Sequence, residues 1–105
     1  MNTQFKKGIL DLCILKVVKD KEMYGFEIID KLSSILDINE NTIYPILRRL
    51  TEQKLFTTYT KDSPHGAQRK YYKITTAGDH KLSIYIDEWD TFIKHVNQIL
   101  KGEVK

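Results

Sequence analysis

The hydrophobic positions in the first half of the chain recur at helical spacing in three stretches. Short polar breaks separate them, the first at residues 19–22 and the second at residues 36–39. Apolar residues at positions i, i+3, i+4 and i+7 line one face of an α-helix. The pattern therefore predicts helices near residues 4–19, 24–35 and 41–53.

The third of these helices contains a proline. Asn39 and Asn41 are both suitable N-cap residues, because a side-chain amide oxygen can accept a hydrogen bond from a free helical N–H. A start near Asn41 puts Pro45 in or just past the first turn, where the missing N–H of proline is tolerated. The expected buried stripe of this helix consists of Ile43, Ile46, Leu47 and Leu50.

The hydrophobic period then changes from helical spacing to β-branched and aromatic runs. Residues 56–60 and 69–75 have this composition, and residues 63–66 between them read Ser-Pro-His-Gly. Two such runs around a loop predict a β-hairpin. Tyr71 and Tyr72 alternate across the second strand, so one of them is expected in the core and the other on the surface.

A long helix capped by Thr76 and ending near Leu100 is predicted to follow the hairpin. Its apolar residues are spaced four and three apart, which is the seam of a coiled coil. At roughly 1.5 Å per residue the helix is about 37 Å long, so one small domain cannot cover the whole seam and a partner helix is expected. The seam consists of Leu82, Ile86, Trp89, Ile93, Val96 and Leu100, and Tyr85, Phe92 and Ile99 widen it.

These elements predict a mostly α protein with a small β-hairpin, of the α+β class. Two short helices joined by a tight turn and followed by a basic hairpin are typical of a winged helix-turn-helix. We expect a DNA-binding domain over residues 1–75 and a C-terminal dimerisation helix over residues 76–105, together forming one compact unit.

Composition narrows the class of protein. The chain has 105 residues, 41% of them hydrophobic and 30% charged, which fits one ordinary globular domain. No apolar run approaches the roughly 18 residues of a membrane span, and no signal peptide is evident, so we expect a cytoplasmic protein without a membrane partner. Cys13, the single cysteine, lies among leucines and isoleucine and is expected to be a buried apolar residue.

The distribution of charge indicates a polyanionic partner. The net charge of the whole chain is +3, but residues 41–75 hold seven basic and two acidic residues, a net charge of +5. Residues 76–100 hold four acidic and two basic residues, a net charge of −2. A basic middle beside a mildly acidic tail favours a nucleic-acid surface with a separate second function.

Three motifs in this order resemble one family. Residues 23–28 (Met-Tyr-Gly-Phe-Glu-Ile) resemble the start of its second helix, and residues 41–50, with the unusual Tyr44-Pro45 pair, resemble its recognition helix. Residues 66–75 and the following Ala77-Gly78 resemble its second wing strand and the start of its last helix. Across nearly its whole length the chain is similar to the PadR family of bacterial transcription regulators, in the short form with a single C-terminal helix.

The resemblance implies a homodimer formed through the first and last helices, which represses nearby genes and in many members is released by a small molecule. The chain departs from the family at Lys54, where glycine is usual after the recognition helix. Glycine suits a left-handed conformation there. Lysine in that conformation would lower the stability of the fold by about 1 kcal/mol. Alternatively, the turn has another shape, which would change the direction in which the wing points.

The candidate DNA-binding residues lie outside the buried stripe of the recognition helix and on the hairpin. The free amides at the helix N-terminus favour phosphate, and Arg48 can contact a guanine edge or a phosphate. Arg49 is one position round, so a contact to the DNA backbone or a charge on the dimer surface is expected. The set is Asn41, Thr42, Tyr44, Pro45, Arg48, Arg49, Lys61, His65, Gln68, Arg69 and Lys70.

Trp89, in the middle of the seam, has two interpretations. It is either a dimer-core aromatic or part of a pocket for a hydrophobic or flat aromatic effector. Glu88 and Asp90 would favour a cationic ligand if they faced this pocket, although the heptad spacing turns Glu88 toward water. The candidate residues for the dimer interface or effector site are Phe5, Ile9, Leu82, Tyr85, Ile86, Trp89, Phe92, Ile93 and Val96.

No pattern predicts an enzyme, a cofactor or a metal site. There is no nucleotide-binding loop and no nucleophile with a partner base, and His80 and His95 lie too far apart on one helix to share a metal. The main expectation is a homodimeric transcriptional repressor that binds a palindromic operator in double-stranded DNA. A winged helix used only for protein docking, or one that binds RNA, is the alternative.

Overall fold

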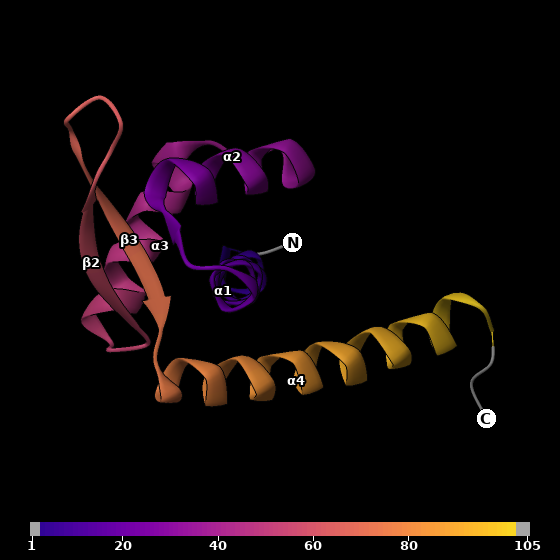
Figure 1. Ribbon diagram of the computed structural model, residues 1–105. Coiled ribbons are helices and arrows are strands. Elements are labelled where there is room, and N and C mark those ends of the chain that lie inside the picture. The colour runs from indigo at the N-terminus through magenta and orange to yellow at the C-terminus, as the bar shows by residue number, and fades with distance from the viewer. Residues whose placement is uncertain (1–2, 103–105) are drawn as a thin grey trace.

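The computed structural model describes the backbone of residues 3–102 and the side chains of residues 8–102. Within these residues, four helices and three strands follow one another (Figure 1). They are α1 (Thr3–Asp20), β1 (Met23–Tyr24), α2 (Gly25–Leu36), α3 (Glu40–Glu52), β2 (Phe56–Asp62), β3 (Gln68–Ile74) and α4 (Thr76–Leu100). The α+β class and every helix and strand expected from the sequence are confirmed.

The sheet has a third strand, β1, which the sequence pattern did not predict. The sheet is antiparallel in the order β1-β3-β2, with Met23 opposite Tyr72 and Tyr24 opposite Tyr71. Two residues are too few to show the alternation that identifies a strand. By adding β1, the chain ties the start of α2 to the base of the wing, which is the hairpin β2–β3 with its connecting loop.

The core lies between α1, α2, α3 and one face of the sheet. All four residues of the expected stripe of α3 are buried, and Tyr72 is the core tyrosine of its pair. Cys13 is only half-buried, and desolvation raises the pKa of its thiol. The buried core includes Leu10, Ile14, Leu15, Val18, Ile28, Leu32, Phe56 and Leu82.

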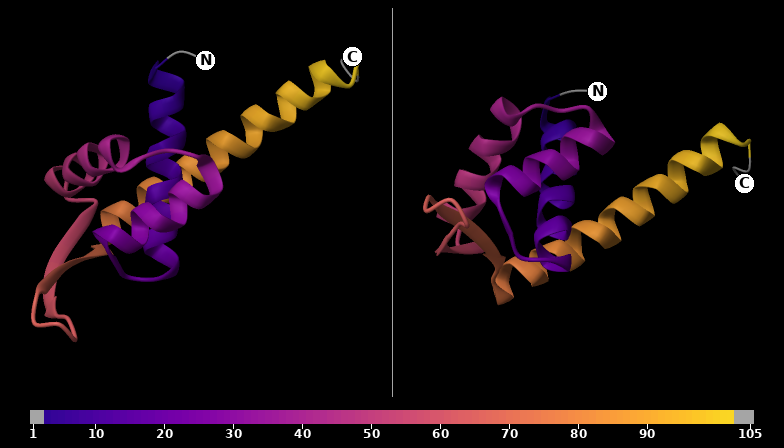
Figure 2. Two further views of the ribbon diagram at one scale, coloured as in Figure 1. Left: turned by 90° about the horizontal axis from the view of Figure 1, so that it is seen from above. Right: turned by 45° about the horizontal axis from the view of Figure 1, so that its top comes forward.

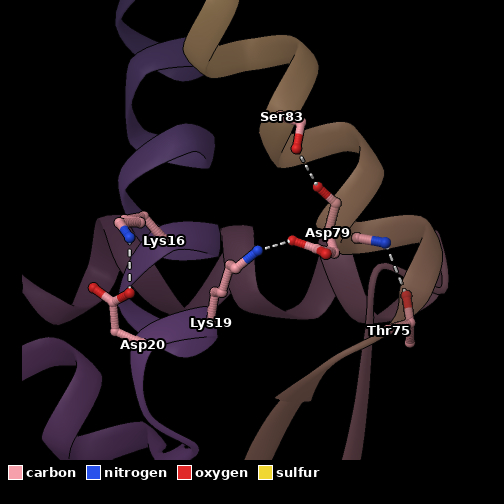
Figure 3. A network of polar contacts seen from close by, with 7 residues as sticks. Lys16, Lys19, Asp20, Thr75, Asp79 and Ser83 are labelled. Atoms are coloured by element: carbon pink, nitrogen blue, oxygen red, sulfur yellow. Dashed lines mark hydrogen bonds and ion pairs between the residues drawn. The ribbon is translucent and has the colours of Figure 1, made fainter.

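Helix α4 crosses α1 near its start and then projects away from the other elements (Figure 2). Lys19 of α1 forms an ion pair with Asp79 in the first turn of α4 (Figure 3). Towards the far end of α4, Ile99 and Leu100 are 69% and 76% exposed. In the part of the chain that the structure describes, no helix is long and apolar enough to cross a membrane.

The N-cap residue of α4 and the way in which Asn39 caps α3 differ from the sequence-based expectation. The N-cap of α4 is Thr75 rather than Thr76, because the Thr75 hydroxyl accepts a hydrogen bond from the Gly78 amide at 2.9 Å. The N-cap of α3 is Asn39, whose backbone carbonyl accepts a bond from the Thr42 amide while its side chain makes no capping bond. Helix α3 therefore begins at Glu40, one residue before the expected start.

Lys54, just after α3, has a left-handed backbone with φ of 63°. Its amide donates to the carbonyl of Thr51 at 2.9 Å, and the next amide, of Leu55, donates to the carbonyl of Leu50 at 2.9 Å. The chain thus makes the turn that glycine would favour, with a lysine that bears the strain of that conformation.

Candidate nucleic-acid interface

Helix α3 presents a polar face to solvent along its whole length. Asn41, Tyr44 and Arg48 are spaced three and four apart, so they lie on one side of the helix. All three are exposed, and so are the neighbouring Thr42 and Pro45. The predicted recognition face therefore consists of residues that are free of the core.

Tyr44 is held in place by the start of α2. A β-carbon added to Gly25 would lie only 3.2 Å from Cε1 of Tyr44, so the missing side chain of this glycine lets the ring pack against the backbone. The ring remains 44% exposed. Gly25 thus supports the recognition helix, because this close contact holds one side of the Tyr44 ring while the residue stays partly exposed.

The wing divides its cationic residues between two faces. Residues directly opposite each other in the register point to the same side of a sheet. Lys70 lies two residues from the buried Tyr72, so it shares the inner face, which continues toward α3. Lys61 is opposite Arg69, and Arg69 is an odd number of residues from Tyr72, so both Lys61 and Arg69 lie on the outer face.

The inner face of the wing carries Lys70 on the same side as the buried Tyr72. The Lys70 ammonium lies 5.9 Å from the ring centre of Tyr72. Burial raises the pKa of Tyr72, which the charge of Arg48 partly offsets. Arg48 on α3 and Lys70 on β3 are both exposed, so both cations remain in solvent.

The outer face has a row of three tyrosines, Tyr24, Tyr71 and Tyr59, one on each strand. The ring centres of adjacent tyrosines are 5.6 and 5.5 Å apart. Arg69 stacks 4.5 Å from the ring centre of Tyr24, and Lys61 lies 4.9 Å from that of Tyr71. Two of the predicted DNA-binding cations are therefore packed on aromatic rings. The contact of Arg69 with Tyr24 depends on β1, a strand that the sequence pattern does not predict.

The tip of the wing holds His65 and Gly66 in solvent. Gly66 has φ of +85°, and its amide donates to the carbonyl of Ser63 at 3.0 Å. This left-handed position closes the loop tightly. Gln68, the first residue of β3, is also exposed beside the loop.

Arg49 lies apart from the predicted interface. Its guanidinium donates two hydrogen bonds to the carboxylate of Asp11 in α1, at 3.0 and 2.6 Å. The side chain of Arg49 is 27% exposed and that of Asp11 only 7%. Sequence spacing placed Arg49 next to Arg48, but the fold turns it inward, and no pattern in α1 marked Asp11 as its partner.

The candidate effector residues are divided between two hollows. The first, between α1 and α4, has a volume of about 300 Å³ and is mostly apolar. Glu88 is exposed, as the heptad spacing predicts, and it also lies on the wall of this open hollow. The hollow is lined by Gly8, Ile9, Leu12, Tyr85, Glu88, Trp89 and Phe92.

The remaining candidates lie elsewhere. Leu82 is 1% exposed in the protomer's own core, so it is not available to a ligand or a second chain. Ile86 lines a second apolar hollow of about 360 Å³ between α1, α2 and α4. Ile93 and Val96 are half-buried further along α4, and the side chain of Phe5 lies outside the described residues.

A helix pair followed by a basic wing and a projecting last helix defines a winged helix-turn-helix regulator. The model of the transcriptional regulator PadR-like family matches residues 14–84, which is well over half of the chain. The protein therefore belongs to the PadR-like family of transcriptional regulators, a family of DNA-binding proteins.

Solved structures of this class are closely similar. A PadR-like transcriptional regulator from Bacillus cereus is 36% identical with a TM-score of 0.85, over 95% of this chain and 99% of that one. A protein from Streptococcus mutans is 30% identical with a TM-score of 0.87, over 94% and 92% of the two chains. An uncharacterised protein from Lysinibacillus sphaericus is 32% identical over 100 residues, covering 91% of this chain and 92% of its own.

Proposed function

We propose that the protein is a cytoplasmic homodimeric repressor that binds a palindromic operator in double-stranded DNA. The observation that carries this proposal is the exposed polar face of α3, with Asn41, Tyr44 and Arg48, followed by a wing with exposed cations such as Lys70. A helix of this kind fits the major groove, where arginine can contact a guanine edge. The wing supplies sequence-independent affinity through its cations.

The shape of α4 supports the homodimer. Its outer half carries exposed apolar residues, among them Phe92 and Ile99, and projects away from the other helices and the sheet (Figure 1). The second apolar hollow, next to the exposed Ile35 and Leu36 of α2, offers such residues a place to bind. Two copies related by a two-fold axis would bury both surfaces at once. Half-sites about one helical turn apart follow from that symmetry.

The hollow beside Trp89 supports release by a small hydrophobic or aromatic effector. Three aromatic side chains, Tyr85, Trp89 and Phe92, and the aliphatic side chains of Ile9 and Leu12 provide a stacking surface. Glu88 on the wall favours a cationic ring over a neutral or anionic one. We therefore propose that planar aromatic cations are the preferred class of effector.

An electrophoretic mobility assay at two salt concentrations tests DNA binding. A duplex selected from a random pool by the purified protein should be retained, with affinity that falls steeply as salt rises. Arg48→Ala and Lys70→Ala should weaken retention while the protein keeps its fold. Equal affinity for RNA, or no retention of any duplex in dilute buffer, would favour an RNA-binding or protein-docking winged helix instead.

Sedimentation of the wild-type protein and of Trp89→Ala tests the interface. The wild type should be a dimer at micromolar concentration, and the variant should either dissociate or lose its response to aromatic cations. A variant that stays dimeric and fully responsive would contradict both roles of this tryptophan.

A further inference from the structure

Asp11 is the one charged side chain that is buried in the part of the chain the structure describes, at 5% exposed. Its two carboxylate oxygens accept separate hydrogen bonds from the two terminal nitrogens of Arg49, at 2.6 and 3.0 Å. The hydrogen bond that Arg49 donates to this carboxylate raises the pKa of Arg49. A two-point bond of this kind fixes the orientation of the guanidinium as well as its distance.

The pair joins the recognition helix to α1 at a position that matters for DNA. Arg49 follows Arg48 directly in α3, so a rotation of α3 that moved one would move the other. With Arg49 fixed to α1, the direction in which Arg48 leaves the helix is fixed as well. Arg49 is thereby placed to fix the pose of α3, while Asp11 holds its guanidinium.

The same turn of α1 forms a wall of the hollow beside Trp89. Gly8 and Leu12, which line that hollow, lie three residues before Asp11 and one after it. From α4, Tyr85 lines the hollow too. The ion pair and the hollow thus share one stretch of α1.

We propose that the Asp11–Arg49 pair couples occupancy of this hollow to the recognition helix, and that Arg49 is a positioning residue. A ligand that displaces the turn from Gly8 to Leu12 shifts the Asp11 carboxylate, and Arg49 carries that shift to α3. The coupling requires that the ligand have different affinities for the arrangements of α1 and α3 before and after this shift. It is also reciprocal, because DNA then changes the affinity for the ligand by the same factor as the ligand changes the affinity for DNA. This inference rests on the proposed DNA-binding function and specifies how that function is regulated.

The test uses a planar aromatic cation, N-methylquinolinium, as the probe. Trp89 is the single tryptophan of the chain, so quenching of its fluorescence reports binding in the hollow. DNA affinity is measured with and without the probe for the wild type, Arg49→Lys and Asp11→Asn. Lysine keeps the charge but loses the two-point fork, and asparagine keeps the shape without the charge. Arg48→Lys is the matched control one position away.

In the wild type we expect the probe to weaken DNA binding by about fivefold or more, the usual scale of coupling between sites. In Arg49→Lys and Asp11→Asn the probe should still quench Trp89 with a Kd within about twofold of wild type, but the effect on DNA should fall to almost none. Arg48→Lys should weaken DNA binding and keep the probe's effect. If Asp11→Asn does not fold, Arg49→Lys decides the matter.

Hydrogen exchange of the α3 amides gives a second readout that needs no DNA. Probe binding should change exchange in α3 of the wild type and leave it unchanged in Arg49→Lys. Undiminished coupling in the folded variants would overturn the inference, as would a wild type without coupling. So would a lower salt dependence of DNA binding in Arg49→Ala, because that would show a direct phosphate contact. Failure of all DNA binding would refute the proposed function, and hydrogen exchange would still decide the coupling.

Discussion

Gly78, in the first turn of α4, packs directly against the backbone carbonyl of Leu55 at the end of the turn that follows α3. A β-carbon at position 78 would lie 2.2 Å from that oxygen and 2.7 Å from Cγ1 of Ile74. The Thr75 hydroxyl donates to the neighbouring Lys54 carbonyl at 2.8 Å while it caps α4. This junction sets the angle at which the long helix leaves the wing.

Gly78→Ala is expected to destabilise the protein by about 1–3 kcal/mol, the usual penalty of overpacking, although alanine is the better helix former. The free energy of unfolding, measured in urea at fixed protein concentration, checks this. Thr76→Ala, an exposed change in the same turn, is the control and should stay within about 0.5 kcal/mol of wild type. Equal stability of Gly78→Ala and wild type would contradict the tight junction.

Lys54→Gly is expected to raise the free energy of unfolding by about 1 kcal/mol. Lysine in the left-handed region bears a steric penalty that glycine does not, and its side chain is exposed, so little packing is lost. Lys54→Ala keeps the β-carbon and should show no such gain. Thermal or urea unfolding of the three proteins makes the comparison, and a gain of the same size in both variants would point to the lost charge instead.

The hydrogen bond of Tyr59 contributes to the free energy of unfolding by an amount that changes with pH in the alkaline range. Its phenol donates a hydrogen bond to the Glu22 carboxylate at 2.6 Å, which raises the pKa of Tyr59 to about 12. Because the folded pKa lies above the unfolded value of about 10, this contribution is complete below pH 10 and is lost as the pH rises toward 12. The stability difference between wild type and Tyr59→Phe should therefore shrink over that interval.

Absorbance at 295 nm provides the direct check on Tyr59. In the wild type the Tyr59 phenol should titrate about two units later than an ordinary tyrosine, and Glu22→Gln should bring that step back toward 10 without moving the raised pKa of Tyr72. An identical titration curve in wild type and Glu22→Gln would rule out the hydrogen bond as the cause.

Lys70 and Lys73 provide a matched pair for the DNA surface. Both are exposed lysines of β3, but their spacing places Lys70 on the inner face, toward α3, and Lys73 on the outer face. Lys70→Ala should weaken DNA binding uniformly across sequences and reduce the salt slope by about one. Lys73→Ala removes the same charge and should leave both nearly unchanged. Equal losses in the two variants would mean that the face of the wing does not matter.

Sequence alone determined the four helices, the two strands of the wing and the class of fold. These follow from local physics, since an apolar stripe at helical or alternating spacing must turn to a core whatever the partner is. The family came from the resemblance of three motifs. The buried stripe of α3 and the exposed Arg48 on its opposite side both came from spacing within one helix. The strand β1 did not, because two residues are too few to show a period and only pairing with β3 makes them a strand.

Tertiary structure decided which cations stay available and which are occupied. Arg48 and Arg49 are alike in sequence, but Arg49 is bound to Asp11, 38 residues away, because the packing of α1 on α3 brings a buried carboxylate beside it. The wing's cations were divided between two faces by the strand register, and β1 brought Tyr24 beneath Arg69. Contacts between residues far apart in the chain leave no periodic trace, so only the folded arrangement reveals them.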